Sequence, residues 1–348
     1  MTNATVPTRL RPFLPPYLLE RIASGGSDRL RECARRTLLA DRGFRARAGI
    51  TPSPPISARP GEPLRYIHSA EGRQDLPGRR VRSEGEEDSG DPAIDEAYHG
   101  LGETYRLFWQ AFGRHSLDDR GLPLVATVHY GQNYENAFWD GRQMVFGEGD
   151  GELFQRFTIA LDIIAHELTH GVIQYEAALA YAGQSGALNE SLSDVFGSLT
   201  KQHARGEGVD QADWLIGEGL FTDRVAGIAL RSMAAPGTAY DDPLLGRDPQ
   251  PGHLDDFVVT EQDHGGVHIN SGIPNRAFHL AAMALGGHAW ESAGRIWYDT
   301  LVDARLGRDS DFATFAALTQ ANAARRFGDG SREARGVREA WREVGVMS

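Results

Sequence analysis

The pentapeptide His166-Glu167-Leu168-Thr169-His170 constrains this chain of 348 residues more than any other segment. Apolar residues recur at helical spacing around it, which predicts that it lies on a helix. Two histidines four positions apart on a helix project from one face, about 40° apart around the axis. Their imidazoles can bind one zinc ion together, and the neighbouring carboxylate can transfer protons.

A catalytic zinc ion takes three protein ligands and leaves one position for water. Glu190 can supply the third ligand, because a helix, a short connection and a returning helix would bring it opposite His166 and His170. Asp194 lies on the same helical face and can accept the second ring N–H of a ligand histidine. Glu167 points about 100° away from His166, so we expect it to be a general base rather than a ligand. An exposed helical carboxylate is the alternative for Glu190 alone.

The segment Asp263–Asn270 reads Asp-His-Gly-Gly-Val-His-Ile-Asn and forms a second candidate constellation. Its two glycines let backbone approach a ligand closely. A histidine beside a glycine pair is usually structural, but the zinc motif upstream favours a functional role for His268.

Three regions follow one another along the chain. Residues 1–58 hold a short apolar block, a basic helical stretch and a proline-rich linker, which predict a removable pro-segment; a disordered tail is the alternative. Residues 59–181 are rich in strand signals and end in the zinc-binding helix, and residues 182–348 are mainly helical. We therefore expect an α+β fold with the active-site cleft between a β-rich and a helical domain.

Composition excludes several classes of function. The formal net charge of -12 argues against nucleic acid and anionic membranes as partners. The single cysteine, Cys33, allows no intramolecular disulfide. We expect no membrane span, a monomer, and synthesis in the cytoplasm without a signal peptide, with later release by another route left open.

The motifs together resemble those of the thermolysin family of zinc metallopeptidases. The resemblance covers roughly residues 60–348 and rests on the segments 136–141, 162–170, 185–194 and 265–272. The segment 15–23, Pro-Pro-Tyr-Leu-Leu-Glu-Arg-Ile-Ala, is similar to the short pro-segment of protealysin-like members. That similarity implies a precursor whose own pro-segment acts as an intramolecular inhibitor until it is cut.

The resemblance also implies a role for each matching position. One catalytic zinc ion is bound by His166, His170 and Glu190, with Asp194 and Asn189 supporting the ligands, and Glu167 is the general base. Tyr181 and His268 stabilise the oxyanion, and Asp263 orients His268. The residues that would hold the substrate backbone are Asn136, Ala137 and Arg231. The pocket for a bulky apolar residue just after the scissile bond would be lined by Phe154, Phe157, Ile163, Ile216 and Leu230.

One departure concerns calcium. Many members of the family carry a double calcium site, to which Asp162, Asp213 and Glu218 correspond, but Lys201 and Leu215 replace two of its acids. Lys201 faces the same side of its helix as Glu190. Our hypothesis is that the lysine charge replaces calcium and that no double site forms.

The predicted function is that of a zinc endopeptidase precursor acting on proteins or peptides. An aminopeptidase would need a motif that grips the substrate amine, and we find none. A catalytically inactive, zinc-stabilised binding module is the second alternative, and the intact Glu167, His268 and Tyr181 argue against it. Cys33 could block zinc as a thiolate, but a small residue packed on a helix is the favoured interpretation.

Overall fold

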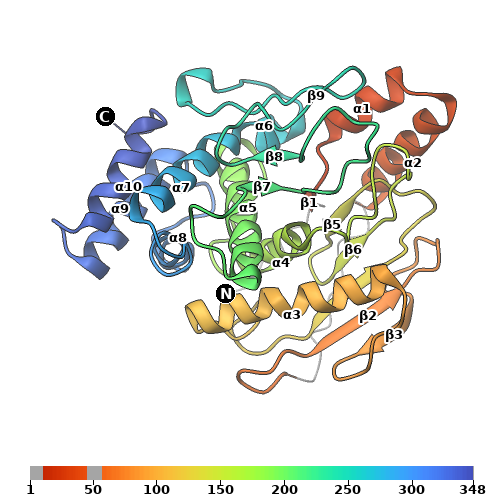
Figure 1. The fold of residues 1–348 in the computed structure, drawn as a ribbon, viewed down its shortest axis with the longest axis horizontal. Helices are drawn as coiled ribbons and strands as arrows, with labels where there is room; N and C mark the ends of the chain where they lie inside the picture. The colour runs from red at the N-terminus through yellow and green to blue at the C-terminus, as the bar shows by residue number, and fades with distance from the viewer. Residues whose placement is uncertain (1–10, 45–56, 348) are drawn as a thin grey trace, which may run out of the picture.

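A mixed six-stranded sheet builds one side of the molecule, in the order β1-β5-β6-β4-β2-β3. The computed structural model describes residues 11–44 and 57–347. The strands are β1 (Arg11–Pro12), β2 (Arg65–Ser69), β3 (Arg79–Ser83), β4 (Leu124–Val128), β5 (Ala137–Trp139) and β6 (Met144–Phe146). β4 runs parallel to both β2 and β6, and the remaining pairs are antiparallel. Parallel strands need a crossover, and helix α3 (Pro92–Phe112) lies on the connection from β3 to β4 (Figure 1).

The helix that carries the pentapeptide, α4 (Leu161–Tyr175), lies at the centre of the molecule (Figure 1). Helix α3 packs against it through Gly100, where a Cβ would lie 2.5 Å from Cδ1 of Ile164. Helix α5 (Gly183–Arg205) packs against another part of α4 through Gly197, where a Cβ would lie 2.7 Å from the carbonyl oxygen of Asp162. These glycines permit the close approach that brings the two motif helices together.

The pro-segment is folded over residues 11–44, against the alternative of a disordered tail. It forms β1, α1 (Pro16–Gly25) and α2 (Asp28–Phe44), and β1 extends the sheet at β5. Leu18, Leu19 and Ile22 of α1 are fully buried. Figure 1 shows both helices, in red, beside β5 and β6. The linker residues 45–56 lie outside the described residues, and the boundary at 58 stays a prediction.

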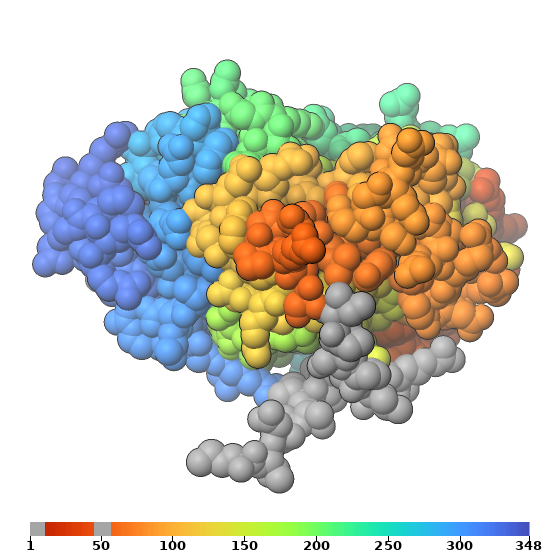
Figure 2. Space-filling model, turned by 90° about the horizontal axis from the view of Figure 1, so that it is seen from below, coloured from red at the N-terminus to blue at the C-terminus, as the bar shows by residue number. Residues whose placement is uncertain are grey.

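The second half is mainly helical, as predicted, so the fold class is α+β. Short strand pairs come first: β7 (Leu215–Ile216) with β8 (Arg231–Ser232), and β9 (Asp241–Asp242) with β10 (Gly246–Arg247). The helices that follow are η1 (Leu254–Asp256), α6 (Asp263–Asn270), α7 (Gly272–Leu285), α8 (Ala293–Leu301), α9 (Phe312–Phe327) and α10 (Arg332–Glu343). Figure 2 shows the last of them, in blue, at the end of the molecule opposite the β-rich region in orange. Within the described residues, no helix combines the length and apolar character that a membrane crossing requires.

Candidate active site

Helices α4 and α5 place the three predicted zinc ligands together in the interior. One ligand atom from each of His166, His170 and Glu190 lies within 4.8 Å of the others, and all three residues are buried. Nε2 of both histidines and Oε2 of Glu190 have no hydrogen-bond partner within the described residues. Buried polar atoms are rarely left unpaired. Two imidazole nitrogens and a carboxylate are also a ligand set that zinc prefers, so the residues fit this metal.

The opposite edge of each imidazole is held by a second layer of polar groups. Nδ1 of His166 lies 2.8 Å from Oδ1 of Asp194, and Nδ1 of His170 lies 2.9 Å from Oδ1 of Asn189. An acceptor at Nδ1 places the ring proton there and leaves the lone pair of Nε2 free for a metal. The contact predicted for Asp194 is therefore present.

Sequence reasoning missed two members of this layer. The Asn275 amide on α7 donates to Oδ2 of Asp194 at 2.9 Å, and the hydroxyl of Ser193 lies 3.0 Å from Nδ1 of His170. Ser193 follows Asn189 by one helical turn, so its spacing could have revealed it. Asn275 lies far along the chain, and nothing in the sequence ties it to Asp194.

Charge in the metal site is balanced by the same contacts. Burial lowers the pKa of His166, but the nearby carboxylates of Asp194 and Glu190 outweigh this and raise the pKa to about 9. Burial tends to raise the pKa of Glu190, yet the neighbouring histidines hold it well below its ordinary value. Burial also raises the pKa of Glu167 to about 8, and this carboxyl is fully buried beside the ligands.

His268 and Tyr181 lie on the side of the site reached from α6. The tyrosine hydroxyl donates to Oε1 of Glu190 at 2.5 Å and lies 3.3 Å from Nε2 of His268. Asp263 accepts the backbone N–H of His268 at 2.8 Å and lies 2.6 Å from its Nδ1. Burial lowers the pKa of His268, but Asp263 and Glu190 outweigh this and raise it to about 9. A run of left-handed residues from Asp263 to Gly266 makes this turn, where glycine is favoured.

The pro-segment runs through the site as an extra strand. Phe13 N–H donates to the carbonyl of Ala137 at 2.8 Å. Asn136 grips Leu14 from both sides: its Oδ1 accepts the Leu14 N–H at 2.8 Å, and its Nδ2 donates to the Leu14 carbonyl at 3.3 Å. The carbonyl of Pro12 lies 2.9 Å from Nε2 of His268.

Phe13 fills the apolar part of the site. Its ring meets that of His166 edge-on, with centroids 5.1 Å apart, and Cζ of Arg231 lies 4.6 Å from its centroid. A Cβ on Gly217 would lie 3.6 Å from the Phe13 ring and 3.4 Å from Cβ of Leu230. The residues predicted to line the substrate pocket are all buried: Phe154, Phe157, Ile163, Ile216 and Leu230.

Two arginines complete this region. Arg231 donates from Nε and Nη2 to Asp194 at 2.8 and 2.7 Å, and its Nη1 lies 3.5 Å from the Phe13 carbonyl. Arg11 of the pro-segment, which sequence reasoning missed, donates to the backbone carbonyl of His170 at 3.0 Å.

Cys33 lies on α2 and is buried, as the favoured interpretation predicted. Burial, followed by the charges of Glu135 and Asp150, raises the pKa of its thiol. The charged groups that act on it are these two carboxyls, Arg29 and Arg36, and none of them is a predicted zinc ligand. The groups that the pro-segment brings to the zinc ligands are the Phe13 ring and the Arg11 guanidinium.

The lysine predicted to replace calcium is paired with acids. Nζ of Lys201 lies 2.9 Å from Oδ2 of Asp162 and 2.8 Å from Oδ1 of Asp213, and it donates to the carbonyl of Leu215 at 2.8 Å. Burial lowers the pKa of Lys201, but the two acids outweigh this and raise it. Glu218 lies 3.9 Å from Arg205 instead and is half exposed.

Comparison with known proteins agrees with this arrangement. Residues 68–174 match the thermolysin metallopeptidase catalytic domain, residues 177–346 match the thermolysin metallopeptidase alpha-helical domain, and residues 11–39 match the protealysin propeptide. An extracellular metalloprotease of Pectobacterium carotovorum subsp. carotovorum is 56% identical over 333 residues, which cover 96% of this chain and 95% of that protein. Protease PrtS of Photorhabdus sp. (strain Az29) is 47% identical over 341 residues, which cover 96% and 91% of the two chains.

A solved structure is also similar over almost the full length. The precursor of protealysin, a metalloproteinase from Serratia proteamaculans, superposes with a TM-score of 0.90 at 56% identity, covering 97% of this chain and 99% of that one. The sequence match, the shared fold and the assembled ligand triad point to one conclusion: this chain belongs to the thermolysin family of metallopeptidases and is a metalloendopeptidase that carries a protealysin propeptide.

Proposed function

We propose that the processed enzyme cleaves protein or peptide chains on the amino side of a bulky apolar residue. The observation that carries this proposal is the path of the pro-segment, which pairs antiparallel with β5 as a substrate would. The Pro12 carbonyl lies at His268, and the next side chain, Phe13, fills the apolar pocket beside His166. A substrate in this register would present its scissile carbonyl where that of Pro12 lies.

We infer that His166, His170 and Glu190 hold one catalytic zinc ion. When bound there, zinc supplies a Lewis acid for the peptide carbonyl and lowers the pKa of water. Glu167 is the residue placed to take the proton of that water and to pass it to the leaving amine. In the precursor its side chain is fully buried.

One donor already meets the carbonyl oxygen, and a second lies beside it. His268, held by Asp263, donates to the Pro12 carbonyl, and the hydroxyl of Tyr181, which now donates to Glu190, lies 3.3 Å from the same ring nitrogen. Donors fixed before the reaction stabilise the negative charge that develops on this oxygen at little cost in reorganisation. Asp263 acts through His268 and is a positioning residue.

The substrate backbone has its partners as well. The carbonyl of Ala137, which now accepts the Phe13 N–H, would accept an N–H of the substrate. The side chain of Asn136, which now accepts from and donates to the backbone of Leu14, would do the same for the next substrate residue. Arg231 reaches the carbonyl of Phe13 while Asp194 fixes its guanidinium. These contacts fix the register, and the buried pocket of Phe154, Phe157, Ile163, Ile216 and Leu230 selects an apolar side chain.

The pro-segment is the intramolecular inhibitor in this proposal. The pro-segment occupies the hydrogen-bonding groups of β5, the apolar pocket and the His268 donor at the same time. A substrate therefore cannot bind until the pro-segment leaves. Removal of residues 1–58 would then release the activity.

No double calcium site forms, in this proposal, because the ammonium of Lys201 holds the place of a cation between Asp162 and Asp213. A buried cation that is already paired makes entry of a divalent ion unfavourable.

Internally quenched peptides that differ only in the residue after the scissile bond test the preference. Leu and Phe should be cleaved faster than Gly or Asp, with the cleaved bond located by mass spectrometry. Glu167→Ala is the matched control, and equal rates for it and the wild type would remove Glu167 from the mechanism. Blocked amino termini should leave the rate unchanged, whereas dependence on a free amine would favour an aminopeptidase.

A further inference from the structure

Two acidic side chains, Glu135 and Asp150, are buried beneath pro-segment helix α2. Glu135 is fully buried and Asp150 is 3% exposed. Within residues 11–44 and 57–347, no donor hydrogen-bonds to either oxygen of Glu135 or to Oδ2 of Asp150. Burial, followed by the neighbouring carboxyl of Asp150, raises the pKa of Glu135 to about 10. Oδ1 of Asp150 accepts three backbone N–H groups of its own loop. Within the described residues, the buried oxygens that have no donor are therefore both of Glu135 and Oδ2 of Asp150.

The pair lies beside the path that a substrate would follow. Gly147 N–H donates to the carbonyl of Asn136 at 2.9 Å, and Gly149 N–H donates to that of Tyr134 at 3.2 Å. These bonds bring the loop that carries Asp150 alongside Glu135. Asn136 is the residue after Glu135. Its side-chain amide accepts the backbone N–H of Leu14 and donates to the Leu14 carbonyl. Leu14 is the second residue after the Pro12 carbonyl, so Glu135 is the chain neighbour of the residue that holds the backbone at that position.

Helix α2 is what covers the pair. The hydroxyl of Thr37 accepts the backbone N–H of Glu135 at 3.0 Å, and both acids act on the buried thiol of Cys33. Arg29 of the same helix donates to the backbone carbonyl of Asp150 at 3.0 Å, not to its carboxyl, and to the side chain of Glu152 at 2.7 Å.

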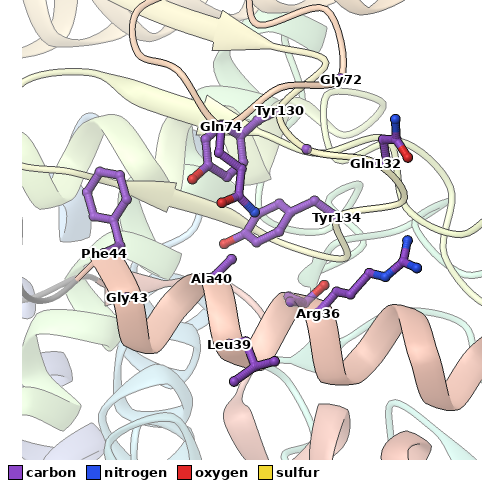
Figure 3. Close-up of a pocket in the computed structure, with 12 residues that line it drawn as sticks. Arg36, Leu39, Ala40, Gly43, Phe44, Gly72, Gln74, Tyr130, Gln132 and Tyr134 are labelled. Carbon is purple, nitrogen blue, oxygen red and sulfur yellow. The ribbon is translucent and has the colours of Figure 1, made fainter.

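The neighbouring part of this interface is visible in Figure 3. It shows Tyr134, the residue before Glu135, lying over α2, at a pocket of about 470 Å³ between the helix and the loop that holds Tyr130 (Figure 3). The tyrosine hydroxyl donates to Asp41 of the helix. Departure of α2 would thus uncover this surface from Tyr130 to Glu135.

We propose that Glu135 and Asp150 form a subsite of the processed enzyme for a Lys or Arg side chain at the second position after the scissile bond. This inference rests on the proposed function and adds a determinant of specificity to it. Once α2 leaves, water reaches the pair and the carboxyls ionise. A long basic side chain can pack its stem beside Asn136 while its charged head hydrogen-bonds to both carboxylates. Charge-assisted bonds of this kind justify an expected effect of about tenfold on kcat/KM.

The test compares two quenched peptides that differ only at the second position after the scissile bond, Lys in one and norleucine in the other. The processed wild type should cleave the Lys peptide about tenfold more efficiently. Glu135→Gln keeps the shape and removes the charge, so it should abolish this ratio while it still cleaves the norleucine peptide. Glu148→Gln is the matched control, because its carboxylate lies on the same loop but contacts His129, 2.7 Å away.

The wild type alone provides a second measurement. Its Lys-to-norleucine ratio should decline as pH falls from about 6 to about 4, because the uncovered Glu135 has an ordinary pKa near 4.5 and protonation removes its charge. Equal cleavage of the two peptides by the wild type, or an unchanged ratio in Glu135→Gln, would overturn the subsite and leave the endopeptidase function standing. Failure of the wild type to cleave either peptide would overturn the proposed function and the subsite with it.

Discussion

Phe13 of the pro-segment should be the residue on which latency depends most. It is fully buried, with its ring against His166 and under the guanidinium of Arg231. In the closed precursor Phe13→Ala leaves a cavity, whereas in the open form residue 13 is solvated in both proteins. Truncation of a fully buried phenylalanine costs about 3–5 kcal/mol. The lower figure already shifts the balance between closed and open precursor by roughly 100-fold toward the open form.

The assay is the initial rate of uncut precursor on a quenched peptide, divided by the rate of the processed enzyme. The chain length is followed by mass spectrometry so that only uncut protein is counted. Leu39→Ala is the control, because it removes a side chain of α2 that is 66% exposed and should leave latency unchanged. The reasoning would be refuted by a Phe13→Ala precursor that is as inactive as the wild type, since the pocket contact would then contribute nothing to inhibition.

Three further outcomes are expected. Lys201→Ala should lower the free energy of unfolding by about 3 kcal/mol, because it leaves two acids without their cation, and millimolar calcium should restore the melting temperature of the variant only. Glu135 has a pKa near 10 when covered and an ordinary value near 4.5 when open, so the covered form loses stability as pH rises through this interval. Limited proteolysis of the pro-segment should accordingly be faster at pH 9 than at pH 6, and Glu135→Gln should flatten the difference. The charged or titratable groups around this site include Asp150, Cys33, Arg29 and Arg36. A chelator should abolish peptide cleavage and zinc should restore it, whereas Glu190→Gln should lower the bound zinc measured by elemental analysis.

Local patterns were sufficient wherever the chemistry lies within a few turns of helix. The spacing of His166, His170 and Glu190 predicted a ligand triad, and the structure places these residues within 4.8 Å of one another. Asp194 could be placed from the same helical period. Regular helices make such predictions possible, because residues four apart share a face whatever the rest of the fold does.

Contacts between segments that are distant in the sequence could not be predicted from helical spacing. The amide of Asn275 donates to Asp194 across 81 residues, and Arg11 donates to the carbonyl of His170 across 159 residues. The order of the sheet places β1 of the pro-segment beside β5, which no local period specifies. These pairings arise from packing, where Gly100 and Gly197 set how closely α3 and α5 approach α4.

The sequence by itself indicated a metal-binding triad from residue type and helical spacing, and its resemblance to the thermolysin family indicated the class of reaction and the presence of a pro-segment. Only the tertiary structure decided how the pro-segment enters the cleft, with the Pro12 carbonyl at His268 and Phe13 beside His166. It also decided that Glu135 and Asp150 are covered by α2. The first outcome depends on the pairing of β1 with β5, and the second on the contact of α2 with Glu135. Both contacts join segments that are far apart in the sequence, where spacing carries no geometric information.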